Sequence, residues 1–180
     1  MIDMKCVPYK RKGLYLALTL PMIVIYILIF CMLWQIKPMF ALIYLSFFVL
    51  VALCMSFVCV YWQCPYVGKF APCVGGFCLP SSQLARLWKN TKRTEGRYKF
   101  FYNAAFVFFF AIIFFPLYFL YMTSIPLLIG YIVVVSLYTV SYMWLICPHC
   151  ATRAACPGGQ SAMALQKWIK KSELDEEEAQ

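Results

Sequence analysis

The stretch LYLALTLPMIVIYILIFCMLW, which covers Leu14–Trp34, decides the fold of this chain. It contains no Asp, Glu, Lys, Arg or His, and about 20 mostly apolar residues suffice for an α-helix to cross the hydrocarbon core of a bilayer. It is also too long for the apolar core of a cleavable signal peptide, which holds about 7–15 residues. We therefore predict that Leu14–Trp34 is a retained transmembrane helix.

Three further stretches repeat this pattern along the chain. They cover Phe40–Trp62, Phe101–Tyr121 and Pro126–Ile146, and none of them contains a charged residue or a histidine. The connections inside the two pairs of spans, Gln35–Met39 and Met122–Ile125, leave room only for a tight turn. We therefore predict an all-α integral membrane protein, a four-transmembrane-helix bundle made of two helical hairpins.

The composition also indicates a chain that is embedded in lipid. Hydrophobic residues make up 64% of the sequence and charged residues only 13%, whereas a soluble domain averages about 25% charged residues. A chain this apolar cannot cover a water-facing surface with polar groups. The lipid bilayer is therefore the first partner that the sequence predicts.

The basic residues predict which side of the membrane the loops occupy. Of the 16 Lys and Arg residues, only Lys37 lies between the two spans of a hairpin. Because cytoplasmic loops carry an excess of Lys and Arg, both termini and the central loop are predicted to be cytoplasmic, in a multi-pass protein of the cell inner (cytoplasmic) membrane. The net charge of +9 is thus a topology signal, and no nucleic-acid partner is predicted.

The two halves of the chain resemble each other beyond their hairpins. Each hairpin is followed by a Trp, a Cys-Pro pair and further cysteines, which read WQCP around Cys64 and WLICP around Cys147. We predict two pseudo-repeated units, residues 1–98 with a cysteine-rich loop and residues 99–180 with a cysteine-rich tail.

A short amphipathic stretch follows the last cysteine of each half, at Leu84–Lys89 and at Leu165–Lys170. At helical spacing, the Leu and Trp side chains of each stretch share one face. A helix of this kind lies in the membrane interface with its apolar face toward the acyl chains. We predict two interfacial amphipathic helices, with Trp88 and Trp168 at the depth of the lipid head groups.

Six cysteines leave the membrane on the predicted cytoplasmic side, three in each half. A reducing cytoplasm disfavours structural disulfides, and thiolates are good ligands for zinc and for iron–sulfur clusters. The tetrapeptide Cys147-Pro-His-Cys150 lets two thiolates reach one metal from a tight turn, and Gly75-Gly76 lets the other loop fold sharply. The candidate metal ligands are Cys64, Cys73, Cys78, Cys147, Cys150 and Cys156.

Three interpretations of these cysteines stay open. An iron–sulfur cluster usually needs four thiolates, and the Cys-Pro pairs fit it because proline stiffens the loop and shields the cluster. A zinc ion held by four thiolates would staple the halves of a structural or assembly subunit; its predicted ligands are Cys73, Cys78, Cys147 and Cys150. A membrane thiol–disulfide oxidoreductase would use Cys147 and Cys150 as its redox pair. We favour the iron–sulfur cluster.

The cysteines that follow the second and fourth spans also resemble those of a known family. Cys73 with Cys78-Leu-Pro80, and Cys156-Pro157, are similar to the Cys-Pro motifs of the four-helix membrane ferredoxin family associated with nitrate and nitrous-oxide respiration. Cys73 and Cys78 lie one residue further apart than in that family. The resemblance implies an iron–sulfur subunit that passes electrons between the quinone pool and a redox partner.

Other chemistries lack the residues that they need. The single histidine, His149, excludes a bundle that holds b-type haem between paired histidines. No carboxylate lies within the spans, which argues against a proton relay built from this chain alone. The sequence thus favours a membrane-integral iron–sulfur electron-transfer subunit of a larger complex. A quinone and other membrane or cytoplasmic subunits are its predicted partners.

Overall fold

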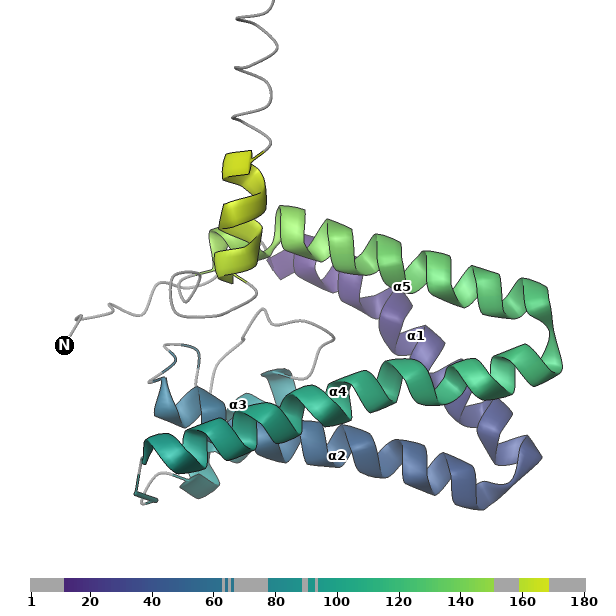
Figure 1. The fold of residues 1–180 in the computed structure, drawn as a ribbon, viewed down its shortest axis with the longest axis horizontal. Helices are drawn as coiled ribbons and strands as arrows, with labels where there is room; N and C mark the ends of the chain where they lie inside the picture. The colour runs from purple at the N-terminus through teal and green to yellow at the C-terminus, as the bar shows by residue number, and fades with distance from the viewer. Residues whose placement is uncertain are drawn as a thin grey trace, which may run out of the picture.

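The computed structural model describes residues 12–62, 64, 66, 78–88, 91–92, 94–150 and 159–168. Four long helices dominate this part of the chain: α1 (Lys12–Ile36), α2 (Pro38–Tyr61), α4 (Glu95–Thr123) and α5 (Ile125–Leu145). All four are long and apolar enough to cross a membrane, and the described residues form no β-strand (Figure 1). The predicted all-α, multi-pass membrane class is therefore confirmed.

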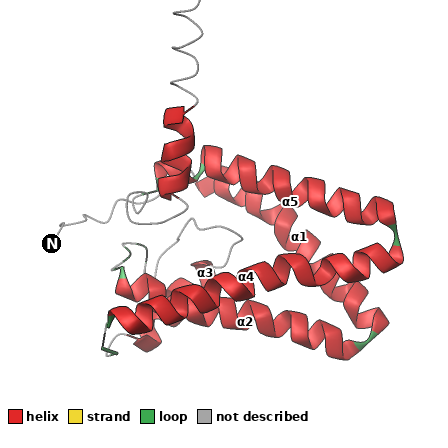
Figure 2. Cartoon of the chain, viewed as in Figure 1, coloured by secondary structure: helices red, strands yellow, loops and turns green. Residues whose placement is uncertain are grey.

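Each hairpin turns on a single residue. Lys37 joins α1 to α2 and Ser124 joins α4 to α5, both with an extended backbone. Pro38 and Pro126 occupy the first turns of α2 and α5, where the missing N–H of proline leaves no hydrogen bond unmade. The four helices therefore extend into the segments that the sequence predicts as connections, Gln35–Met39 and Met122–Ile125. Figure 2 shows the two remaining connections as short green links.

The four helices pack in a ring, in the order α1, α2, α4 and α5, with α5 returning to α1. The start of α1, the end of α2, the start of α4 and the end of α5 lie on one side of the molecule (left in Figure 1), here called the loop end. Lys37 and Ser124 lie at the opposite, hairpin end. The segments that carry the cysteine-rich loops therefore leave the ring at one end.

Shorter elements cover the loop end. The helix α3 (Cys78–Leu84) continues directly into the 3-10 helix η2 (Ala85–Trp88), and both pack on α2. The 3-10 helix η3 (Cys147–His149) follows α5. A further helix over 159–168 places Ala162 in the core of the loop end, where it is fully buried.

The first predicted interfacial helix is built differently. Residues 84–88 end α3 and form η2 instead of one continuous amphipathic helix. Trp88 donates a hydrogen bond from Nε1 to Oγ of Ser56 in α2 (2.6 Å), whereas Leu87 is 69% exposed. The expected common face of Leu87 and Trp88 is therefore wrong, because the indole turns inward to a buried partner on α2.

Two clusters of buried side chains hold the ring together. The loop-end cluster includes Tyr15 of α1 and Tyr142 of α5, whose rings meet edge to face with centroids 6.2 Å apart. The hairpin-end cluster joins all four helices and includes Leu33 and Ile112. Most of the remaining large apolar side chains of α1 and α5 are exposed on the outside of the ring, a surface that fits the acyl chains of a bilayer.

A side chain of α5 donates a hydrogen bond to the turn of α4 that precedes an internal proline. Pro116 lacks an N–H, so the carbonyl oxygen of Ile112, four residues earlier, loses its usual helical partner. The hydroxyl of Tyr131 donates to the carbonyl oxygen of Ile113, at 3.1 Å. This bond ties α5 to the turn of α4 that the proline disturbs, at the carbonyl next to that of Ile112, and contacts of this kind help a bundle in lipid to tolerate a proline.

Replacing Tyr131 with Phe removes this hydrogen bond without removing the ring. Interhelical hydrogen bonds in membrane proteins contribute about 0.6 kcal/mol on average, so we expect a loss of stability of this size in unfolding by SDS titration. Tyr121→Phe is the matched control, since Tyr121 is exposed at the hairpin end of α4. Equal midpoints for the two variants would show that the Tyr131 hydroxyl does not stabilise the helix pair.

Candidate metal centre

The first candidate ligand that the structure describes follows the end of α2. Cys64 donates a hydrogen bond from its backbone N–H to the carbonyl oxygen of Cys59, at 3.0 Å. This bond turns the chain back toward the ring after the last turn of α2. Cys64 is half-buried, and its side chain packs against the loop-end cluster together with the buried Tyr66.

The second pair of candidate ligands forms one tight turn after α5. The N–H of Cys150 donates to the carbonyl oxygen of Cys147, at 3.2 Å, and the N–H of His149 donates to that of Ile146, at 3.1 Å. Pro148 lies inside this 3-10 turn, early enough that its missing N–H is not needed. Cys147 is 8% exposed, Cys150 is half-buried and His149 is exposed.

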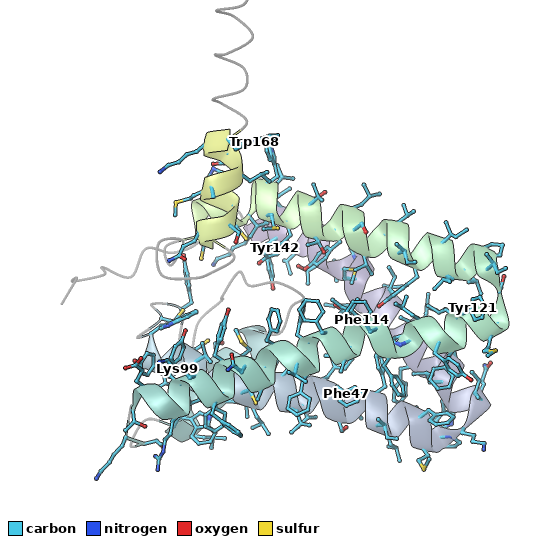
Figure 3. The ribbon with its side chains drawn as sticks, viewed as in Figure 1. Phe47, Lys99, Phe114, Tyr121, Tyr142 and Trp168 are labelled. Carbon is cyan, nitrogen blue, oxygen red and sulfur yellow. The ribbon has the colours of Figure 1, made fainter. Side chains whose placement is uncertain are left out.

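Cysteines from the two halves of the chain share one environment. Cys147 belongs to the loop-end cluster, and Cys64 and Cys150 pack against the same cluster. Tyr142, one turn before Cys147, points from α5 into this region (Figure 3). The arrangement follows from the ring order, because the ends of α2 and α5 lie at the same side of the molecule.

The other three candidate ligands are not tested by this geometry. Cys73 and Cys156 lie outside the described residues, and only the backbone of Cys78, the first residue of α3, is described. Within the described part of the chain, no three His, Cys, Asp or Glu side chains lie close enough to hold a metal ion. Every ligand set that the sequence predicts includes at least one of these three cysteines.

The remaining described cysteines lie in the spans. Cys54 and Cys59 are buried in α2, and Cys31 is exposed on the outer surface of α1. None of the cysteines with a described side chain forms a disulfide. This leaves the candidate site with thiols that are chemically able to ligate a metal or to take part in redox exchange.

Sequence reasoning did not single out the tyrosines that surround the candidate ligands. Tyr15, Tyr66 and Tyr142 are all at least 95% buried in the loop-end cluster. Their signal in the sequence is weak, because a Tyr near the end of a span is typical of any membrane boundary. Only the folded ring shows that they share one buried cluster with Cys147 and that Cys64 packs against this cluster.

Comparison with protein-family models, curated proteins and solved structures finds no match to this chain. The class of protein therefore rests on the fold itself. In the part of the chain that the structure describes, the protein has four helices of membrane-spanning length, and the ends of α2 and α5, which lead into the cysteine-rich segments, lie at one end of the ring.

Proposed function

We propose that this protein is a membrane-integral iron–sulfur electron-transfer subunit of a larger membrane complex. Its proposed ligands are drawn from Cys64, Cys73, Cys78, Cys147, Cys150 and Cys156. The observation that carries the proposal is the packing of Cys64, Cys147 and Cys150, from both halves of the chain, against one apolar cluster.

The burial of the described cysteines suits the chemistry of such a centre. Thiolates are the usual ligands of iron–sulfur clusters, and burial and solvent access tune the reduction potential. Cys147 is almost fully buried in the cluster that also contains Tyr15 and Tyr142, so little of its thiol is accessible to water. An iron–sulfur cluster would supply one-electron redox chemistry, and the chain would hold its thiolates at the membrane boundary.

The spacing of the cysteines supports the proposed pseudo-repeat. Cys64-Pro and Cys147-Pro are each followed, nine positions after the cysteine, by Cys73 and Cys156, and each of these is followed one residue later by Gly-Gly. A pair of loops with the same spacing suits two halves that contribute equivalent ligands to one centre. Cys78 and Cys150 have no counterpart in this alignment and would be the ligands that distinguish the halves.

The outer face of α4 supports the proposed contact with a quinone or another membrane subunit. Phe106, Phe110 and Phe114 form a ladder at helical spacing, with ring centroids 4.6 and 5.7 Å apart. All three rings are exposed and would meet lipid, a partner helix or a flat aromatic ring. With the excess of Lys and Arg at the loop end, we place this end in the cytoplasm.

Elemental analysis of the full-length protein, purified without oxygen, tests the identity of the metal. We expect iron and acid-labile sulfide in equal amounts, because iron–sulfur clusters contain both. Stoichiometric zinc without sulfide would overturn this proposal in favour of a zinc-stapled structural or assembly subunit. Protein purified from cells grown in iron-rich medium controls for incomplete loading.

A thiol–disulfide oxidoreductase is the second candidate, favoured by the single turn that joins Cys147 to Cys150. In this reaction the two thiols become one disulfide, and their two electrons and two protons reduce a partner disulfide to two thiols. Exchange with a model disulfide that persists after complete chelation of metal would support this function. Activity that disappears in Cys150→Ser but not in Cys31→Ser would assign it to this pair.

A further inference from the structure

The loop end of α2 and α4 carries a belt of stacked aromatic side chains that the proposed function does not use. Tyr61 of α2 stacks on Tyr98 of α4, with ring centroids 4.4 Å apart and the planes 11° apart. Trp62 and Tyr102 both lie 5.8 Å from the Tyr98 ring. Tyr and Trp gather where hydrocarbon meets lipid head groups, so this belt marks one membrane boundary.

Aromatic residues near the other end of α4 mark the opposite boundary. Tyr118 and Tyr121 are exposed there, and Figure 3 places Tyr121 and Lys99 at opposite ends of the helix. At 1.5 Å per residue, Tyr98 and Tyr118 are about 30 Å apart along α4. The hydrocarbon core of a bilayer is also about 30 Å thick. Residues that precede Tyr98 therefore lie at the level of the head groups.

Exposed cations and exposed apolar side chains occur on η2, on the segment that follows it and on the first turns of α4. The packing of Trp88 against Phe101, with ring centroids 5.5 Å apart, holds η2 beside the first turns of α4. The surrounding exposed residues, here called the basic rim, are Arg86, Leu87, Lys92, Arg97 and Phe100. The rim thus combines three positive charges with two large apolar side chains, each of which is 69% exposed.

The acidic residue nearest the basic rim does not cancel its charge. Glu95 is the only Asp or Glu in the described part of the chain. Its carboxylate lies 2.8 Å from the ammonium group of Lys99, one helical turn further along α4. Because this pair is neutral, Arg86, Lys92 and Arg97 leave the rim with a net positive charge.

We propose that the basic rim binds an anionic phospholipid. Lys92 and Arg97 precede Tyr98 and so lie at the head-group level, while Arg86 belongs to η2, which packs beside the first turns of α4. Leu87 and Phe100 are exposed apolar side chains of the same two elements. Charge complementarity selects the anionic head group, and the exposed apolar pair selects a lipid over a free phosphate ion. Each Lys or Arg near an anionic membrane surface raises affinity by about fivefold, so three cations together contribute about a hundredfold.

Thermal unfolding of the full-length protein in a neutral detergent, with added phosphatidylglycerol or phosphatidylcholine, tests this proposal. We expect phosphatidylglycerol to raise the midpoint of unfolding more than phosphatidylcholine does. The triple variant R86Q/K92Q/R97Q should need about a hundredfold more phosphatidylglycerol for the same rise. Lys37→Gln, at the hairpin end, should respond like the wild type, because it removes an exposed cation outside the rim.

A variant that adds net positive charge keeps the test valid if the triple variant does not fold. Glu95→Gln releases Lys99 from its ion pair and should lower the amount of phosphatidylglycerol required. Equal responses to the two lipids, or equal responses of the triple variant and Lys37→Gln, would overturn the proposal. An equal rise with inorganic phosphate would overturn it too, since it would show an anion site without lipid. None of these outcomes depends on the cysteines.

Discussion

Replacing Cys147 with Ser is expected to remove the proposed metal centre from the whole protein, and not from one half of it. Cys147 is the most buried of the candidate ligands with a described side chain, and it lies in the cluster that Cys64 also contacts. A Ser hydroxyl stays protonated and is a far weaker ligand than a thiolate for iron or zinc. The metal content of purified Cys147→Ser, relative to protein, should therefore fall to background.

Two further cysteine variants complete this test: one lies outside the candidate site and one in its other half. Cys31→Ser makes the same chemical change on the lipid-facing surface of α1 and should retain full metal content. Cys73→Ser extends the test to the other half and should again remove all metal. Retention of half of the metal in Cys147→Ser would contradict a shared site and would show that each half holds its own.

Trp88→Ala is expected to cause the largest loss of stability among the tryptophan variants. The Trp88 ring packs edge-on against Phe57 and against Phe101, both with centroids 5.5 Å away, and its Nε1 donates to the fully buried Ser56. Truncation of a packed Trp costs about 3–5 kcal/mol. Ser56 also loses a donor inside the protein, which adds to the cost. SDS-induced unfolding measures the change.

Trp168→Ala is the matched control from the second half of the chain. Trp168 is the tryptophan of the second amphipathic stretch, one position earlier in the stretch than Trp88, and its side chain is 69% exposed. A substitution at such a surface position changes stability by about 0.5 kcal/mol or less. If both variants lost the same stability, Trp88 would not be the anchor that joins η2 to α2 and α4.

The transmembrane helices were predictable because one physical requirement dominates them. In lipid, a stretch such as Leu14–Trp34 must form its backbone hydrogen bonds within one helix. It also contains no charged residue, so the sequence alone identifies it as a membrane span. The sequence predicted the first and last residues of these helices less accurately. Pro38 and Pro126 let α2 and α5 begin earlier than the apolar runs suggest, since proline is compatible with a first helical turn.

The surroundings of the candidate site depend on contacts between distant segments, which sequence patterns do not encode. The spacing of Cys147 and Cys150 predicts a tight turn, and the structure has one. The common environment of Cys64 and Cys147 arises only because the ring brings the ends of α2 and α5 to one side. Likewise, the amphipathic pattern of residues 84–88 does not predict that the Trp88 indole forms a hydrogen bond to Ser56 of α2.

The visible absorption spectrum of the full-length protein, purified without oxygen and then reduced with dithionite, tests the central claim most directly. A cluster held by the cysteines of the loop end should give a broad visible band that bleaches on reduction and returns on reoxidation, as iron–sulfur clusters do. Cys147→Ser should lack the band, and Cys31→Ser should keep it. A colourless wild-type protein that carries stoichiometric zinc, or no metal at all, would contradict the electron-transfer function proposed for this chain.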